Sequence, residues 1–252
     1  MTSADTGRPE YVRIAAEIAQ RIDSGDLQHG DRLPTSGELA AEHGVSRTGV
    51  ANRALRLLDQ SGYTDARSGR ITTVSRPTRY VLPMYLLEGD DRGRDAFDDA
   101  VKQQGGTPYQ HIRVETVTAD THVSSALGLP TGELVLVRRR TRYIDSVPYC
   151  IADSYFPHSL VADTEIANPA DIKRGGRHVL SDMGYGMARH QDRIQARWPR
   201  THELAELVLN TAIGMPLICH YRTSSTSEGT PVRYMCSYLP GDRWEITYEV
   251  ES

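Results

Sequence analysis

The chain has 252 residues, of which 38% are hydrophobic and 25% charged, and its formal net charge is −4. This is the composition of a soluble globular protein with one large or two ordinary domains, and it excludes a disordered chain. No apolar run approaches the roughly 18 residues of a membrane-spanning helix, and the negative charge means that any DNA-binding surface must be a local basic patch.

Residues 11–24 predict a first helix, because isoleucine recurs at every fourth position and forms one apolar stripe. A short second helix is expected after Pro34. Thr35 and Glu38 have the spacing of a capping box, in which each side chain satisfies a free backbone N–H group of the other residue. Gly44 is expected to end this helix.

Ser46 can cap a third helix, which we expect to run to about Ser61 with its buried face centred on Val50. Residues 63–66 and 71–74 then predict the two short strands of a hairpin. A short helix, a tight turn, a longer helix and a hairpin form a winged helix-turn-helix, whose third helix fits the major groove of DNA. This segment therefore predicts a DNA-binding domain.

The third helix is basic within an acidic chain, because three arginines and no acidic residue lie between Ser46 and Leu58. Arg47 can make two hydrogen bonds to a guanine, and Asn52 can make two to an adenine. The arginines are alternatively surface charges of an ordinary helix, but the complete motif favours DNA contact. The candidate DNA-binding residues are Thr35, Ser36, Ser46, Arg47, Thr48, Asn52, Arg53, Arg56, Ser68, Gly69 and Arg70.

Residues 76–83 predict a linker, because prolines bracket the segment and no helical stripe crosses it. The linker divides the chain into a domain over residues 1–75 and a domain over residues 84–252. The second domain alternates β-rich runs with helices. We expect helices over residues 95–104 and 201–212 and strands over residues 111–118 and 133–143.

The second domain contains an internal repeat. The segments 140–155 and 222–238 each run from Arg-Thr through a turn and a proline to Ser-Tyr. A predicted helix ending in Gly-x-Pro precedes each segment. Two copies of a helix-plus-hairpin unit would build one antiparallel sheet with helices on a face, which is an α+β fold.

Residues 11–74 resemble the DNA-binding domain of the GntR transcription regulators. Three motifs carry the resemblance: Gly-Asp-x-Leu-Pro at 30–34, Glu-Leu-Ala at 38–40 and Gly-Val-Ser-Arg at 44–47. The rest of the chain is similar to the UTRA effector-binding domain of the HutC subgroup. Its motifs are Arg140-x-Arg142, Asp145-Ser146-x-Pro148, Asp192-x-Ile194 and Gly-Asp-Arg-Trp at 241–244.

The resemblance implies a fold in which an N-terminal winged helix-turn-helix domain precedes a C-terminal, chorismate lyase-like UTRA domain with an antiparallel sheet and flanking helices. It also implies a homodimer that binds a palindromic or near-palindromic DNA operator, with half-sites about 10 bp apart. A small-molecule effector would alter that binding. Relatives often carry operator-contacting arginines at the positions of Gly37 and Ala51, so their operator consensus is not expected here.

Arg140 and Arg142 match an arginine pair that grips an anionic group in relatives, and the planar guanidinium group suits this by bonding a carboxylate or phosphate twice. Sugar-binding acids of some relatives fall at Ala152 and Arg233, and a phosphate-binding hydroxyl falls at Asp98. These departures disfavour a phosphosugar against a carboxylate or a larger, more apolar compound. The candidate effector-binding residues are Phe97, Asp98, Arg140, Arg142, Ser154, Tyr155, Arg222, Arg233, Tyr234 and Tyr238.

Both candidate groups in this domain have an alternative interpretation. Arg138, Arg140 and Arg142 alternate along one strand, so they can instead form a solvated face paired with acids. The tyrosines at 155, 234 and 238 are equally suited to the core and to a pocket wall.

No catalytic, metal or cofactor site is expected. The histidines and cysteines lack metal-ligand spacing, and the chain has no nucleotide-binding fingerprint or nucleophile elbow. Three widely spaced cysteines suit a reducing compartment, and the polar N-terminus has no signal-peptide core, so we expect a cytoplasmic protein.

The leading hypothesis is therefore a ligand-responsive transcriptional regulator, specifically a repressor that its effector releases from DNA, and not an enzyme. Two alternatives stay open. The first is a constitutive dimeric DNA-binding protein whose C-terminal domain senses nothing. The second is a chorismate lyase-like enzyme, which the absence of a recognisable catalytic set disfavours.

Overall fold

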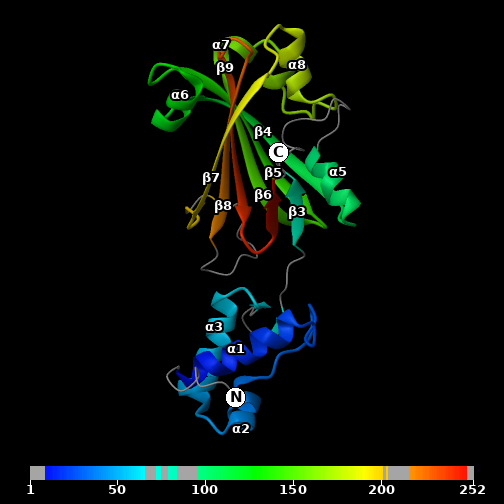
Figure 1. The fold of residues 1–252 in the computed structure, drawn as a ribbon, viewed down its shortest axis with the longest axis vertical. Coiled ribbons are helices and arrows are strands. Elements are labelled where there is room, and N and C mark those ends of the chain that lie inside the picture. The colour runs from blue at the N-terminus through cyan, green and yellow to red at the C-terminus, as the bar shows by residue number, and fades with distance from the viewer. Residues whose placement is uncertain are drawn as a thin grey trace. The chain divides into compact units, whose positions relative to one another are not determined.

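The computed structural model describes residues 9–65, 72–74, 79–83, 96–200, 203 and 216–248. The chain divides into two compact units (Figure 1). The described residues up to Val74 belong to the first unit, and those from Arg79 onward belong to the second.

The first unit contains helices and one pair of antiparallel strands. The elements are α1 (Glu10–Asp23), α2 (Ser36–His43), the π-helical turn η1 (Arg47–Ala51), α3 (Asn52–Gln60), β1 (Thr64–Asp65) and β2 (Thr73–Val74). The predicted isoleucine stripe of α1 is fully buried and packs against Leu39, Ala54 and Leu58 of the following helices. The order predicted for a winged helix-turn-helix is present.

The ends of α2 confirm two local predictions. Thr35 Oγ1 accepts a hydrogen bond from the N–H of Glu38 at 3.2 Å, and Glu38 Oε2 accepts one from the N–H of Thr35 at 2.7 Å. This reciprocal pair is the capping box. Gly44 ends the helix in the left-handed conformation at φ 65°, where a side chain would be strained.

The second unit is built on an antiparallel sheet with strand order β4-β5-β6-β9-β8-β7. Its strands are β4 (Pro108–Thr118), β5 (Leu134–Ile144), β6 (Val147–Pro157), β7 (Arg189–Arg197), β8 (Leu217–Ser225) and β9 (Pro231–Pro240). The described helices are α5 (Ala96–Gln103), α6 (Thr121–Leu127), α7 (His158–Val161), η2 (Glu165–Ala167) and α8 (Gly176–Asp182). The α+β fold of the sequence prediction is therefore confirmed.

The strand order reflects the internal repeat. The segment 140–155 lies in the hairpin β5–β6, and the segment 222–238 lies in the hairpin β8–β9. The two hairpins meet through β6 and β9, where Asp153 pairs with Cys236 at the centre of the register. One outer strand, β4 or β7, then flanks each hairpin.

Side chains alternate along each strand, so the sheet has two faces. The arginine face carries Arg138, Arg140 and Arg142 of β5, and its apolar parts pack against α5, α7 and α8. The tyrosine face carries Tyr155 of β6 and Tyr234 of β9, and it packs against α6. Consecutive residues of one strand therefore lie on opposite faces of the sheet.

The predicted linker needs a correction. Tyr80–Pro83 form strand β3, which pairs in parallel with β10 (Trp244–Thr247) in the second unit. Tyr80 and Leu82 are buried there beside Trp244. The flanking prolines suggested an irregular segment, and the strand's partner lies at the far end of the sequence.

Other predicted boundaries vary by a few residues. The expected strand at 111–118 begins earlier, as β4 at Pro108. Of the helix expected over 201–212, only Glu203 is described, and it is helical; the rest lies outside the described residues. Among the described helices, none has the length and apolar character to cross a membrane.

Candidate DNA-binding surface and effector site

The recognition helix, η1 followed by α3, presents its basic side to solvent. Arg47, Thr48, Arg53 and Arg56 are exposed, and Asn52 is half-buried. The opposite side is buried at three positions, which are Ala51, Ala54 and Leu58. The predicted orientation is confirmed, although Ala51 rather than Val50 is the buried residue of the first turn.

Two contacts hold the arginines of this helix against its neighbours. Arg47 Nε donates to Ser36 Oγ of α2 at 3.3 Å, which joins the two helices of the motif. The guanidinium group of Arg53 lies over the ring of Tyr11 in α1, 4.6 Å from its centroid. A cation on an aromatic face gains some attraction while it stays accessible. Both arginines are therefore held at the surface.

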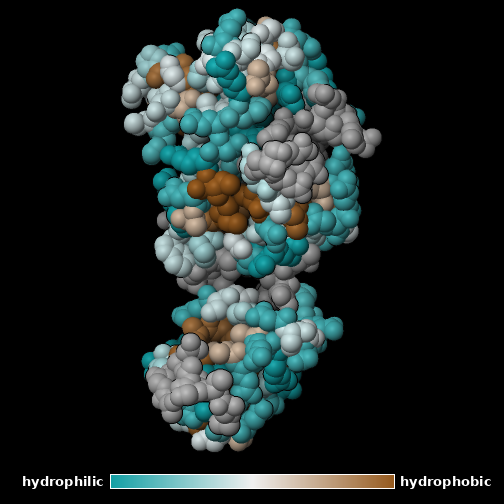
Figure 2. All heavy atoms as spheres, in the orientation of Figure 1, coloured by the Kyte–Doolittle hydropathy of each residue, from teal (hydrophilic) through white to brown (hydrophobic). Residues whose placement is uncertain are grey.

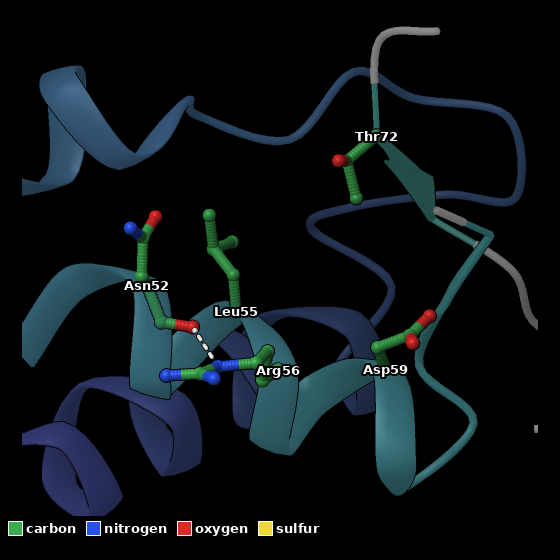
Figure 3. A pocket seen from close by; sticks show the side chains of 5 residues that line it. All are labelled: Asn52, Leu55, Arg56, Asp59 and Thr72. Atoms are coloured by element: carbon green, nitrogen blue, oxygen red, sulfur yellow. Dashed lines mark hydrogen bonds between the residues drawn. The ribbon is translucent and has the colours of Figure 1, made fainter. Parts of the chain in front are cut away.

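A hollow of about 390 Å³ lies between α3 and the strand β2. Asn52, Leu55, Arg56 and Asp59 line it from the helix, and Thr72 lines it from the segment before β2 (Figure 3). In that view Asn52 and Leu55 point the same way, whereas Arg56 turns back so that its Nε donates to the carbonyl oxygen of Asn52 at 3.3 Å.

The remaining candidate DNA-binding residues differ in exposure, and three of them lie outside the described residues. Thr35 is exposed and Ser36 is half-buried at the start of α2. Ser46 is exposed but makes no side-chain cap, which corrects the prediction that it caps the third helix. Ser68, Gly69 and Arg70 lie outside the described residues.

The three arginines of β5 differ in role although they share the arginine face. Arg138 is fully buried and donates to the backbone carbonyls of Ile166 at 2.9 Å, of Ala170 at 3.0 Å and of Asn168. Burial lowers the pKa of its guanidinium group. Arg138 is therefore a structural residue, and the interpretation as a solvated surface charge is wrong for this arginine.

Arg142 lies against α5. Its guanidinium group is 4.4 Å from the ring centroid of Phe97, and its Nη1 is 3.9 Å from Asp98 Oδ1. Arg140 is half-buried on the same face, and its cross-strand partner on β6 is Ala152. Arg140 and Ala152 are thus neighbours on the arginine face.

Arg233 of β9 faces the same side and donates to Ser154 Oγ of β6, from Nε at 3.2 Å and from Nη2 at 2.8 Å. Ser154 itself is buried. A cation and a hydroxyl group thus meet across two adjacent strands of the arginine face.

Arg222 is held in a buried network on β8 and β7. Its Nε and Nη2 donate to the two carboxylate oxygens of Asp192 at 2.7 and 2.8 Å. His220 Nε2 lies 2.6 Å from Asp192 Oδ1, and since a carboxylate only accepts, this nitrogen carries the proton. Burial alone would raise the pKa of Asp192, but the hydrogen bonds from Arg222 and His220 outweigh it and lower the pKa.

The three candidate tyrosines lie on the other face of the sheet. Tyr234 stacks on Tyr221 with ring centroids 6.4 Å apart and an interplanar angle of 11°, and Tyr155 and Tyr238 belong to the same cluster. Burial raises the pKa of each candidate tyrosine, so all three stay neutral. They cannot share a site with the arginines, which corrects the single effector site of the sequence analysis.

The tyrosine face has a hollow of its own. It measures about 580 Å³ and lies between α6, β7 and β8, with Arg193, Tyr221 and Thr223 among its lining residues. The guanidinium group of Arg193 lies 4.7 Å from the ring centroid of Tyr221. Nothing in its lining points to one class of ligand.

Two family models match this chain. Residues 10–74 match the bacterial regulatory proteins of the gntR family, and residues 103–245 match the UTRA domain. The chain belongs to the GntR family, with a UTRA domain. This GntR–UTRA protein has the HutC-like architecture and is a ligand-responsive, DNA-binding transcriptional regulator.

Relatives resemble the regulator over nearly its whole length. An uncharacterised HTH-type transcriptional regulator of Streptomyces coelicolor is 29% identical, over 96% of this chain and 92% of that protein. The HTH-type transcriptional repressor NagR of Bacillus subtilis is 24% identical, over 96% of this chain and 95% of that protein. A crystal structure of a GntR-family transcriptional regulator shares the fold, with a TM-score of 0.67 at 22% identity, over 97% of this chain and 98% of that chain.

Two residues of the arginine face of this GntR regulator, Asp192 and His220, are not among the predicted site residues. Asp192 was visible only as part of a family motif. Its link to Arg222 depends on the register of β7 on β8, which pairs these two residues directly. A pattern along one strand carries no information about that pairing.

Proposed function

We propose that this regulator is a homodimeric repressor that binds a palindromic operator and is released by a small anionic effector bound on the arginine face. The observation that carries the proposal is that seven candidate residues share that face, contributed by α5 and four strands: Phe97, Asp98, Arg140, Arg142, Ser154, Arg222 and Arg233. The repressor role is supported by the name of the relative NagR.

The chemistry of the face favours an anionic effector. Arg140, Arg142 and Arg233 bring three guanidinium groups to one side of the sheet, while Asp98 is the acid beside Arg142. Planar guanidinium groups bond carboxylates and phosphates through two parallel hydrogen bonds. Because Ala152 and Arg233 stand where some relatives have sugar-binding acids, a carboxylate or a larger apolar anion fits better than a phosphosugar.

The edge of the sheet supports a dimer. β7 is an outer strand, and its Ile194 is 54% exposed on the arginine face. Trp198, just after this strand, is 65% exposed. Figure 2 shows hydrophobic residues gathered in a patch on the visible side of each unit. Exposed apolar residues at a sheet edge are common at interfaces between protein chains.

The test is release of bound DNA by a ligand. Purified protein is screened by thermal shift against small carboxylates and phosphorylated compounds, because a ligand that binds only the folded state raises the apparent stability. Each stabilising compound is then added to a protein–operator complex. The proposal predicts dissociation of wild-type protein and a loss of sensitivity in Arg140→Ala.

Three results would contradict parts of the proposal. No stabilising ligand, together with specific operator binding, would favour a constitutive DNA-binding protein. Turnover of a compound would revive the chorismate lyase-like enzyme. A monomer by light scattering at operator-binding concentrations would exclude the dimer. By linkage, a releasing effector must also bind more weakly by the same factor when DNA is present.

A further inference from the structure

The recognition helix starts with an unusual turn. The N–H groups of Val50 and Ala51 both point to the carbonyl oxygen of Ser46, at 3.0 and 3.1 Å, and the N–H of Asn52 bonds to the carbonyl oxygen of Arg47. A hydrogen bond from residue i+5 back to residue i defines a π-helix, which is rare and occurs mostly as single turns, often at functional sites. The rest of the helix, from Asn52 onward, is α-helical.

The turn changes which residue lies above Arg47. In a regular α-helix Ala51 would lie there, one turn on, and Asn52 would be rotated about 140° around the axis from Arg47. The π turn instead directs Ala51 into the core, where it is 0% exposed beside Ala54 and Leu58. The N–H of Asn52 bonds to the carbonyl oxygen of Arg47, so Asn52, which is half-buried, follows Arg47 by one π turn.

From Asn52 the exposed stripe continues at α-helical spacing. Arg56 lies one turn further, and its Nε donates a hydrogen bond to the carbonyl oxygen of Asn52 at 3.3 Å. Asn52 and Arg56 line the hollow that faces Thr72 (Figure 3). Arg47, Asn52 and Arg56 therefore form one continuous polar stripe along the recognition helix.

Two local features fit the π turn. A Cβ atom at Gly49 would lie 2.6 Å from Ser46 Oγ, so a larger residue there requires the exposed Ser46 side chain to move. The Arg47 side chain is fixed to α2 by its hydrogen bond to Ser36 Oγ. The first turn is thus joined to the neighbouring helix through Arg47.

We propose that the π turn is a specificity device, which stacks Asn52 on Arg47 so that the two side chains read adjacent base pairs in the major groove. Arginine recognises guanine and asparagine recognises adenine, each through two hydrogen bonds. The inference rests on the proposed function, since it requires a sequence-specific operator. It assigns a base contact to Asn52. In a regular α-helix of the same sequence, Asn52 would point away from the position of Arg47.

The experiment selects the operator and then tests it one base pair at a time. Wild-type protein is used to select a binding site from randomised DNA, and its affinity for each single base-pair variant of that site is measured. The same series is measured for Asn52→Ala, for Arg47→Ala and for Arg53→Ala, which is the matched control one residue further along. A variant with Ala51 deleted, which restores regular α-helical spacing, completes the set, with circular dichroism to confirm that each variant is folded.

We expect the loss of Asn52 or of Arg47 to change base preference at a single position of each half-site. Asn52→Ala loses about tenfold to a hundredfold discrimination at one base pair in each half-site, adjacent to the pair at which Arg47→Ala loses its discrimination. Arg53→Ala weakens binding to all sequences alike and lowers the salt dependence. Folded protein lacking Ala51 keeps its discrimination at the Asn52 pair, because Asn52 then follows Arg47 by four residues and lies one turn above it in a regular α-helix.

Two results would overturn the inference in distinguishable ways. If wild-type protein selects an operator but Asn52→Ala keeps every base preference, the π turn does not set specificity, whatever the deletion variant does. If wild-type protein selects no sequence at all, the proposed function itself fails, and the inference falls with it.

Discussion

The two faces of the C-terminal sheet are built from the same strands but carry different kinds of side chain. On the tyrosine face, Tyr234 and its neighbours pack into an aromatic and aliphatic cluster beneath α6. On the arginine face, Arg140 and Arg233 lie over small or hydroxyl-bearing neighbours, Ala152 and Ser154. Because side chains alternate, adjacent residues of one strand lie on different faces, and residues that are close in a motif can be separated by the whole sheet.

The largest effect is expected on the tyrosine face. Tyr234→Ala removes a buried ring and lowers the free energy of unfolding by about 3–5 kcal/mol, the cost of truncating a large buried aromatic side chain. Urea unfolding of the full chain measures this change. If the variant remains as stable as wild type but no longer responds to effector, Tyr234 belongs to the effector site and the division between faces is wrong.

Arg138→Met sharpens the comparison within the arginine face itself. The substitution keeps the buried volume but leaves the carbonyls of Ile166, Asn168 and Ala170 without their donor. Unsatisfied buried carbonyls should lower the free energy of unfolding by about 2–3 kcal/mol. Unfolding in urea, with Arg140→Met as the matched control, checks whether the loss is specific to Arg138.

Arg140→Ala, unlike Arg138→Met, should affect effector binding rather than stability. Stability changes little because the side chain is only half-buried, while affinity for an anionic effector falls about tenfold to a hundredfold, as for the loss of a charged hydrogen bond. Isothermal titration calorimetry with the effector found by screening measures the affinity. Equal affinity in wild type and variant would move the effector site elsewhere.

The smallest expected effect is a loss of stability as the pH falls. Asp192 has a folded-state pKa below its usual value, so it contributes stability above the unfolded pKa, and that contribution is lost as the pH falls through the folded pKa. Burial lowers the pKa of His220, so protonation of the unfolded state also favours unfolding as the pH falls below about 6.5. Stability should therefore decline on acidification.

Asp192→Asn tests the first of these contributions. The slope of unfolding free energy against pH below about pH 4 should be smaller in this variant than in wild type, because one fewer carboxyl group binds a proton on unfolding. Thermal unfolding across a pH series provides the slopes. Identical slopes would show that Asp192 keeps an ordinary pKa despite its bonds to Arg222 and His220.

The sequence predicts well those features that local chemistry decides. The capping box of Thr35 and Glu38 and the left-handed Gly44 follow from residue type and spacing. The repeat predicts two hairpins, and Asp145 and Ser146 adopt the positive φ angles of 50° and 67° that a tight hairpin turn requires. In each case the interacting residues are close together in the chain.

Features that depend on distant pairing or on backbone register were not predictable. Strand β3 exists because Tyr80–Pro83 meet Trp244–Thr247, more than 150 residues later. The π turn shifts the recognition helix by one residue, so a helical wheel misplaces the buried position, and Ser46 makes no side-chain cap. Alternation along one strand separates Arg233 from Tyr234, but the separation of Tyr155 and Tyr238 from Arg140 needed the register of β5, β6 and β9.

The central claim is that this chain binds specific DNA through a local basic helix within an acidic protein. A mobility shift at two salt concentrations, with DNA from upstream of its own gene and Arg47→Ala as the control, tests it most directly. We expect a sequence-specific complex that weakens as salt rises and is lost in the variant. A complex of equal strength in wild type and Arg47→Ala, or none on either this DNA or a randomised pool, would contradict it.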